Sequence, residues 1–151
     1  MKILKAEIED LQEIYRLQKE AFIIEAKIHN NYSIQPLTQT FEEVKKEFGN
    51  AIALKAVNED GKIVGSVRGI TDNSTLYIGK LMVHPDFQNR GIGKKLLSSI
   101  EDMFPGFRYE LFTSTKSDKN LAIYIKNGYR EFKRESSPVG VDFVYLSKNA
   151  K

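Results

Sequence analysis

Apolar residues recur at steps of three and four in two stretches of the chain, residues 9–25 and residues 91–103. This spacing puts apolar side chains on one face of an α-helix, so both stretches are predicted to be amphipathic helices. The apolar face of the second consists of Ile92, Leu96, Leu97, Ile100 and Phe104. Such faces need a sheet or further helices to cover them.

Runs of apolar and β-branched residues predict three consecutive strands in the middle of the chain. Residues 51–58 and 62–70 are joined by Glu59-Asp60-Gly61, which is typical of a hairpin turn. A third strand is predicted at residues 75–83. Gly79 inside it indicates a β-bulge or a close backbone approach.

The remaining segments complete the order of elements. Two shorter helices are predicted, at residues 40–48, where Thr40 and Glu43 form a capping box, and at residues 117–126. The other predicted strands are residues 2–5, 107–115, 129–133 and 141–146. Three antiparallel strands followed by crossovers predict an α+β domain, with a mixed sheet and helices on its faces. The length predicts one domain over residues 1–151.

Composition excludes several kinds of chemistry. The chain has no cysteine, which rules out disulfides, thiolate nucleophiles and cysteine-ligated metals. Its two histidines, His29 and His84, exclude a multi-histidine metal cage but not an all-carboxylate site. The net charge of +3 is too small to indicate nucleic acid as a partner. No signal peptide or membrane-spanning run is present in the sequence, so a cytoplasmic protein without a membrane partner is expected.

The most informative segment joins a predicted strand to a predicted helix and reads Gln88-Asn89-Arg90-Gly91-Ile92-Gly93-Lys94-Lys95. A helix begins with free backbone N–H groups and the positive end of its dipole, and two glycines let an anion come close. Arg90, Lys94 and Lys95 add three positive charges. The segment is therefore predicted to hold a diphosphate.

Three kinds of phosphate-binding loop compete for this segment. A Walker loop requires glycine at Gln88 and serine or threonine at Lys95, so it is excluded. A dinucleotide-binding loop requires a third glycine at Leu96, so that match is partial. The pattern Gln/Arg-x-x-Gly-x-Gly/Ala fits at every defined position, and in this the segment resembles the GNAT superfamily of acyl-CoA-dependent N-acetyltransferases.

A second segment carries the same resemblance. Tyr124, Lys126, Gly128 and Tyr129 stand at the defined positions of the family's Tyr-x-Lys-x-Gly-Phe/Tyr pattern. The predicted order of elements also resembles that of the family over essentially the whole chain. The resemblance implies a three-layer GNAT fold with a mixed, mostly antiparallel seven-stranded sheet. It implies acetyl-CoA as cosubstrate and no metal.

The resemblance also implies where acetyl-CoA binds, in a cleft where the strands at residues 75–83 and 107–115 splay apart. The main chain of Leu81, Met82 and Val83 would pair with the pantetheine arm. An amide of Met82 or Val83 would face the thioester oxygen, where it stabilises developing negative charge. The diphosphate would contact Gln88, Asn89, Arg90, Gly91, Ile92, Gly93 and Lys94. Asn120 would reach the CoA arm or merely cap its helix.

By the same resemblance, Tyr124 protonates the leaving thiolate, with a packing role as the alternative reading of this residue. Many family members carry a glutamate on the strand that corresponds to residues 75–83, but this strand has no carboxylate. Glu110, Glu25 and ordered water are the remaining candidates for the proton acceptor. Because the chain has no cysteine, direct transfer in a ternary complex is expected.

These features predict an N-acetyltransferase that acts on a primary amine of a small molecule or peptide. Residues 25–48 and 135–141 are expected to select the amine, and a homodimer is compatible with the sequence. A second hypothesis is an acyl-CoA sensor or partner-binding module without turnover, which the missing carboxylate motivates. A third is a nucleotide-dependent oxidoreductase that uses the partial dinucleotide motif.

Overall fold

The computed structural model of the protein describes residues 1–138 and 140–150; Lys151, and Val139 of the predicted amine-selecting segment, lie outside the described residues. Within this part of the chain, a seven-stranded sheet has the order β1-β2-β3-β4-β5-β7-β6. The strands are β1 (Lys2–Lys5), β2 (Ile52–Val57), β3 (Ile63–Asp72), β4 (Thr75–Val83), β5 (Arg108–Ser114), β6 (Arg130–Ser136) and β7 (Asp142–Lys148). The helices are α1 (Leu11–His29), α2 (Gln35–Thr38), α3 (Phe41–Gly49), α4 (Ile92–Asp102) and α5 (Asp118–Lys126), with 3-10 turns at Ile8–Asp10 and Pro85–Phe87.

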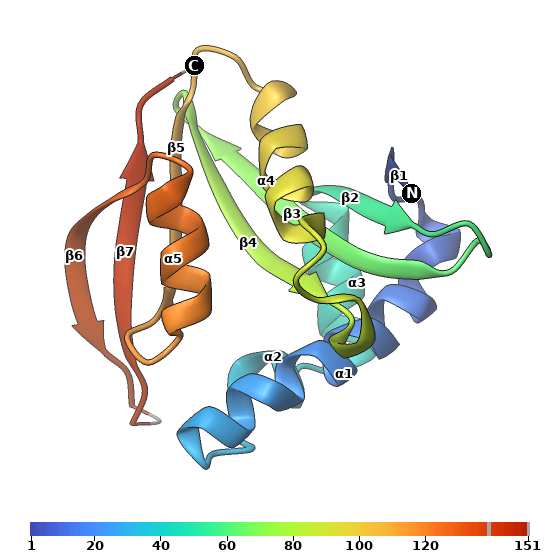
Figure 1. Ribbon diagram of the computed structural model, residues 1–151, viewed down its shortest axis with the longest axis horizontal. Coiled ribbons are helices and arrows are strands. Elements are labelled where there is room, and N and C mark those ends of the chain that lie inside the picture. The colour runs from blue at the N-terminus through green and yellow to red at the C-terminus, as the bar shows by residue number, and fades with distance from the viewer. Residues whose placement is uncertain (139, 151) are drawn as a thin grey trace.

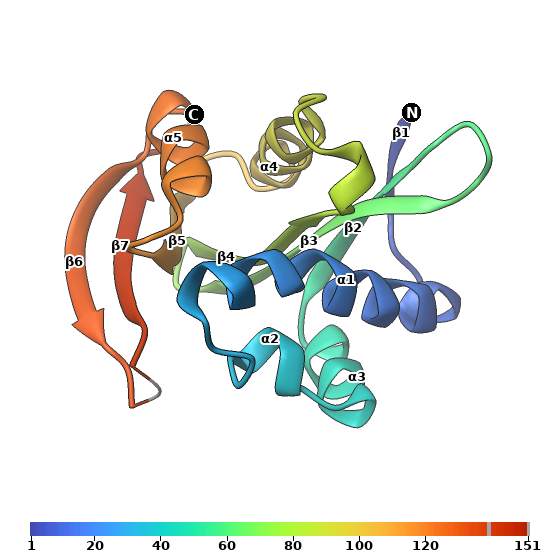
Figure 2. The same cartoon turned by 60° about the horizontal axis from the view of Figure 1, so that its bottom comes forward.

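The layers confirm the predicted α+β architecture. Helices α4 and α5 cover one face of the sheet, and α1, α2 and α3 lie on the other (Figures 1 and 2). The sheet is mixed and mostly antiparallel, and among the described strands β4 and β5 form the parallel pair. The three-layer arrangement places the ends of β4 and β5 between helices of both outer layers.

The region after α1 differs from the prediction. The helix continues four residues past residue 25 and ends at His29, where Asn30 adopts a left-handed conformation with φ of 48°. Its last turn is favoured because Ala26 is fully buried and Lys27 and His29 lie at the negative end of the helix dipole. The sequence pattern does not predict α2, because Pro36 breaks the helical period; proline is, however, favoured in a first turn.

Two apolar clusters hold the sheet between its helices. Under α4, the predicted face is confirmed, since Ile92, Leu96, Leu97 and Ile100 are all buried against the sheet and Phe104 packs at the margin. On the other face, Ile14 and Leu17 of α1 pack with Met82 of β4. The strand β4 therefore contributes side chains to both cores.

Gly69 in β3 allows α4 to approach the sheet closely. An added Cβ would lie 2.8 Å from Leu76 Cδ1 and 2.9 Å from Ile100 Cδ1. We therefore expect Gly69→Ala to lower the free energy of unfolding by about 1–3 kcal/mol, measured by urea denaturation. The matched control is Gly79→Ala in β4, where an added Cβ meets no atom within 4 Å. Equal losses in both variants would contradict the close-approach argument.

A β-bulge distorts β4 next to the predicted position. The register runs from Arg68↔Gly79 to Ser66↔Met82, so two residues of β4 oppose one residue of β3. The positive φ, 50°, belongs to Lys80 rather than to Gly79. A lysine in this conformation is strained, and strain of this kind is concentrated at functional sites.

The strands β4 and β5 separate soon after they meet. They pair only from Thr75↔Arg108 to Tyr77↔Glu110. Beyond this point β4 still pairs with β3, and β5 still pairs with β7. The facing edges of β4 and β5 are therefore free of strand partners over the rest of their length, which confirms the predicted splay.

Candidate active site

A cavity of about 550 Å³ lies at the splay between β4 and β5. Its walls come from α1, α2, α3, β4, β5, α5 and β7. Most of the walls are apolar or aromatic, and this group consists of Phe22, Ile34, Pro36, Ile78, Leu81, Phe112, Val141, Phe143 and Tyr145. The polar side chains that project into it include Glu25, His29, Glu47, Lys80, Asn120 and Tyr124. We call this space the central cavity.

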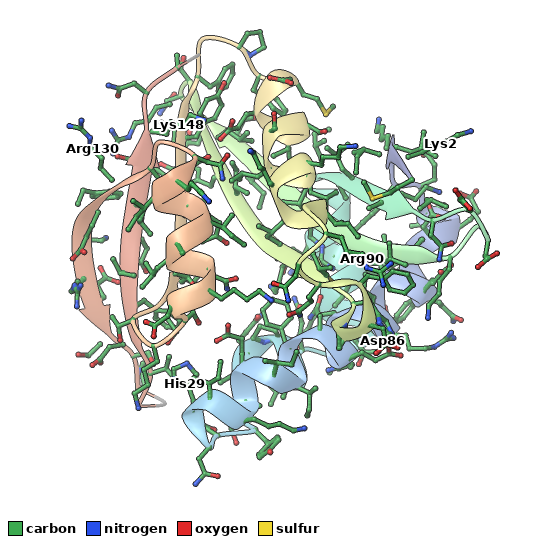
Figure 3. All side chains as sticks on the ribbon, viewed as in Figure 1. Lys2, His29, Asp86, Arg90, Arg130 and Lys148 are labelled. Carbon is green, nitrogen blue, oxygen red and sulfur yellow. The ribbon has the colours of Figure 1, made fainter. Side chains whose placement is uncertain are left out.

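The predicted diphosphate loop lies between β4 and α4 (Figure 3 labels Asp86 and Arg90). Asn89 and Gly91 have positive φ values of 63° and 78°, which turn the chain sharply into the helix. Gly91 is the N-cap and no side chain caps α4, and no acidic residue occupies its first turn. The first backbone amides of α4 are therefore available to an anion, which is the geometry a diphosphate requires.

The side chains of the loop are arranged around these amides. Asn89, Arg90 and Lys94 are exposed, and the Arg90 guanidinium lies 5.0 Å from the ring centroid of Phe87. Ile92 is buried beneath the helix, so its main chain alone can face a ligand. An added Cβ at Gly93 would lie 3.7 Å from Val83 Cγ2, an ordinary contact. The residues present therefore fit the phosphates of CoA.

Gln88 connects the two sides of the splay. Its Nε2 donates to the Val83 carbonyl (3.4 Å), and its Oε1 accepts from Lys119 Nζ of α5 (2.7 Å). Lys119 is thus a further positive charge beside the loop. Sequence reasoning missed it, because no local pattern relates the start of α5 to a residue 31 positions earlier.

The segment predicted to pair with pantetheine lies at the end of β4. Met82 is buried toward α1, whereas Leu81 and Val83 are half-buried and pack toward α4. On one side Met82 and Val83 pair with Ser66 and Gly65, and the edge toward β5 has no strand partner. This backbone edge can accept an extended ligand.

Tyr124 of α5 reaches the central cavity from the same side as α4. It is 5% exposed, and its ring centroid lies 6.1 Å from that of Tyr129. Burial raises the pKa of the Tyr124 phenol far above its ordinary value, and the negative charge of Glu25 raises it further. The phenol therefore stays protonated over the whole physiological pH range and can act as an acid.

Glu25 of α1 faces Tyr124 across the cavity and is held in place by hydrogen bonds. Ser117 Oγ donates to its carboxylate at 2.8 and 2.6 Å, and Asn120 Nδ2 lies 3.5 Å from Oε1. His29, one helical turn along, has Nε2 3.7 Å from Glu25 Oε2. Figure 3 shows His29 at the end of α1, on the side of the hairpin formed by β6 and β7. Asn120 therefore lies beside Glu25, one helical turn before Tyr124 in α5.

The two carboxylates among the candidate proton acceptors lie in different places. Glu110 is bonded to Arg108 Nε at 3.0 Å and lines an adjoining hollow of about 450 Å³, without Tyr124. Glu25 lines the central cavity together with Tyr124. Of the two carboxylates, Glu25 is the one that shares a cavity with the candidate acid.

Other polar residues have structural roles. His84 Nδ1 accepts from the Asp86 amide (3.1 Å), and Nε2 lies 2.7 Å from Glu20 Oε2, which ties the end of β4 to α1. Tyr129 donates to Glu101 Oε2 at 2.6 Å in the core. Gly128 has φ of 96° and turns the chain from α5 into β6. The second sequence motif therefore combines one residue in the cavity with packing and turn residues.

No group of three or more histidine, aspartate or glutamate side chains within residues 1–138 and 140–150 is placed to hold a metal ion. No helix among the described residues is long and apolar enough to cross a bilayer.

Sequence reasoning also missed a buried ionic cluster on the α1 side of β4. It consists of Arg68, Lys80 and Glu47, joined by Gln18 and Gln39. No spacing pattern could indicate it, because its members come from five segments that meet only in the folded protein.

Comparison with solved structures identifies the same fold in other proteins. The ribosomal-protein-S18-alanine N-acetyltransferase from Escherichia coli aligns with a TM-score of 0.82 at 16% identity, covering 99% of this chain and 94% of that one. A GNAT phosphinothricin acetyltransferase from Sinorhizobium meliloti, solved with AcCoA, gives 0.79 at 16% identity, covering 99% and 88%. The PaiA N-acetyltransferase from Thermoplasma acidophilum, solved with coenzyme A, gives 0.69 at 21% identity and covers 98% of both chains.

At the level of sequence, no curated protein matches the chain. The sequence profile of the acetyltransferase (GNAT) family matches residues 9–129, which include the predicted diphosphate loop, the splayed strands and Tyr124. This range is most of the chain. The protein therefore belongs to the GNAT family of acetyltransferases, enzymes that transfer an acetyl group from acetyl-CoA.

Proposed function

We propose that the protein acetylates a primary amine of a small molecule or peptide, by direct attack of that amine in a ternary complex. The observation that carries the proposal is the central cavity, where Tyr124 and Glu25 face each other at the splay among apolar walls. The relatives named for ribosomal-protein alanine and for phosphinothricin support an amine acceptor but differ in its size. Residues 1–151 would act as one acetyltransferase domain in the cytoplasm.

Binding would use main-chain groups at both ends of the cleft. The free edge of β4 at Leu81, Met82 and Val83 would pair with the pantetheine arm, and an amide of Met82 or Val83 would face the acyl oxygen. The α4 amides, with Arg90 and Lys94, would hold the diphosphate. Acetyl-CoA supplies the electrophilic acyl carbon and the thiol leaving group.

The proton steps would use one residue on each side of the acyl carbon. An ammonium acceptor first loses a proton to Glu25, which passes it to solvent. The neutral amine nitrogen then forms a bond to the acyl carbon while the carbon–sulfur bond breaks. The thiolate takes the Tyr124 proton, and the surplus proton on the new amide nitrogen returns through Glu25 and water to the Tyr124 oxygen. The net reaction of an ammonium acceptor moves one proton from nitrogen to sulfur and releases a second proton to solvent.

The direct test is a thiol-release assay with acetyl-CoA and a panel of amino acids, amino sugars, polyamines, aromatic amines and peptides with free N-termini. Turnover with at least one amine is expected. The second candidate function, an acyl-CoA sensor, rests on the absence of a carboxylate from β4. It gives CoA binding without acetylation of any member of the panel, and that result would overturn the proposal.

Glu25→Gln is expected to lower kcat/KM about 100-fold at pH 7, because the amide cannot accept a proton although it keeps the shape and the Ser117 bond. The loss should shrink as the pH rises toward the amine pKa of about 10, where the acceptor deprotonates without help. Glu110→Gln is the matched control, since Glu110 is bonded to Arg108 outside the central cavity. The measurement is a pH–rate profile of kcat/KM for each variant. Equal losses in Glu25→Gln and Glu110→Gln would exclude Glu25 as the proton acceptor.

A further inference from the structure

The ionic cluster on the α1 side of β4 contains two cations and one carboxylate. Arg68 Nη1 lies 3.0 Å from Glu47 Oε1, and Lys80 Nζ lies 3.3 Å from the same oxygen. The side chains of Arg68 and Lys80 are 3% and 14% exposed. Glu47 is the one carboxylate that either cation contacts among the described residues. The cluster therefore carries one uncompensated positive charge in a largely buried place.

The neutral partners in the cluster do not remove that charge. Gln18 Oε1 accepts from Arg68 Nη2 at 3.0 Å, and Gln39 Nε2 donates to Glu47 Oε2 at 2.7 Å. Arg68 Nε is buried and finds no acceptor anywhere in the described chain. A largely buried positive charge without a counter-charge is costly, so an anion bound beside Lys80 would stabilise this arrangement.

The ionisation of the cluster agrees with this picture. Burial lowers the pKa of Lys80, and the nearby Arg68 lowers it further, against the opposing effect of Glu47. Burial raises the pKa of Glu47, but Lys80, Gln39 and Arg68 together bring it below its ordinary value. Glu47 is thus ionised, and the two cations repel each other.

The cluster borders the space in which the acceptor must lie. Lys80 and Glu47 line the central cavity, while Arg68 and Glu47 line the adjoining hollow of about 450 Å³. The two spaces share walls at Glu47, Gly79 and Phe112. An anion on the acceptor can therefore approach Lys80 directly and Arg68 from the adjoining hollow.

The other charges in these walls are locally balanced, except one. Glu110 pairs with Arg108, and Lys133 pairs with Glu135, each at 3.0 Å. Glu25 is the exception, since its one basic partner among the described residues is His29. The cleft therefore has a negative position at Glu25, beside Tyr124, and a positive position at Lys80 and Arg68.

We infer that the acceptor is a zwitterion, in which an amine faces Glu25 and Tyr124 and a carboxylate faces Lys80 and Arg68, with an apolar body against the aromatic walls. Opposite charges on the ligand would satisfy both uncompensated positions at once. This inference rests on the proposed function and names the substrate class within it. Amino acids with apolar chains are the simplest molecules of this kind.

The test uses two matched pairs of compounds, phenylalanine with phenethylamine and 6-aminohexanoate with hexylamine. In each pair the first compound carries a carboxylate that the second lacks, and the distance between amine and carboxylate differs between the two pairs. The zwitterion of at least one pair is expected to have a kcat/KM about tenfold or more above that of its partner amine. Lys80→Met should abolish this preference with little change for the plain amine, and Lys80→Arg should keep it. Acetyl-CoA affinity within about twofold of the wild-type value would show that the variants retain their fold.

Calorimetric titration of the CoA-loaded protein with the same four compounds gives a readout that does not depend on turnover. Tighter binding of a zwitterion, lost in Lys80→Met, supports the inference even where acetylation is slow. If both plain amines have a kcat/KM and an affinity equal to or above those of their zwitterionic partners, the inference is overturned while the proposed function stands. A preference that survives Lys80→Met would also overturn it. Failure of every amine in the wider panel would instead overturn the proposed function.

Discussion

Tyr124→Phe is expected to lower kcat about 100-fold while acetyl-CoA binds with nearly unchanged affinity. Phenylalanine fills the same buried site on α5 against Tyr129, so packing is kept and only the hydroxyl is removed. Without that proton donor, the thiolate must leave unprotonated or take a proton from water. The measurement is steady-state kinetics together with a direct titration of acetyl-CoA.

The matched control for this variant is Tyr15→Phe. Tyr15 lies in α1, and its hydroxyl donates to the Gln39 carbonyl at 3.2 Å, outside the central cavity. It should leave kcat unchanged. Because the pKa of Tyr124 is raised, the phenol stays protonated as the pH increases through the alkaline range. An alkaline fall in kcat near pH 8–9 that vanishes in Tyr124→Phe would therefore contradict this account of its environment.

Gly93→Asp is expected to weaken acetyl-CoA binding by about 100-fold or more, because a carboxylate in the first turn of α4 would repel the diphosphate. Two like charges about 4 Å apart at a protein surface repel by about 4 kcal/mol. The stability of the fold should not decrease. An aspartate near a helix N-terminus is favourable, and the added Cβ meets only Val83 at an ordinary distance. Calorimetric titration with CoA measures the binding affinity, and a thermal melt measures the stability of the fold.

Gly93→Ala is the control, since it makes the same backbone change without the charge. Its CoA affinity should stay within about threefold of the wild-type value. Gly91 is a poorer position for the test, because any side chain would be strained at its φ of 78°. A loss of CoA affinity there could then not be distinguished from a loss of stability. Unchanged affinity in Gly93→Asp, with the melt intact, would show that the diphosphate lies elsewhere.

Much of the fold could be predicted from local patterns. The predicted bounds of β4 are those observed, and the predicted capping box of α3 is confirmed by hydrogen bonds between Thr40 and Glu43 at 2.9 and 3.2 Å. Both signals lie within a few neighbouring residues. The end of α1 at His29 was harder to predict, because its last turn is stabilised by the core contact of Ala26 rather than by a regular apolar period.

The candidate site was predictable only in part. The predicted diphosphate loop and Tyr124 belong to contiguous motifs, so their positions in the fold follow from the order of elements. The ionic cluster does not, since Arg68 contacts Glu47 and Gln18 across 21 and 50 residues of chain. Asn120 stays a prediction as a CoA contact, because its amide turns toward Glu25 and Thr113. Long-range packing determines these contacts, and one sequence carries no pattern for it.

The short pairing of β4 with β5 has a thermodynamic consequence. Backbone hydrogen bonds join strands β1, β2, β3 and β4 into one unit and strands β5, β7 and β6 into another. The two units are joined by a strand pairing that is only three residue pairs long. The apolar cluster beneath α4 and α5 must therefore supply most of the cooperativity between these halves. In the proposed binding mode, acetyl-CoA pairs with the free edge of β4 and fills the cleft between β4 and β5, so it would add to that coupling and stabilise the whole sheet. Amide exchange in β6, which contributes no residue to the walls of the central cavity, would then slow as acetyl-CoA concentration rises.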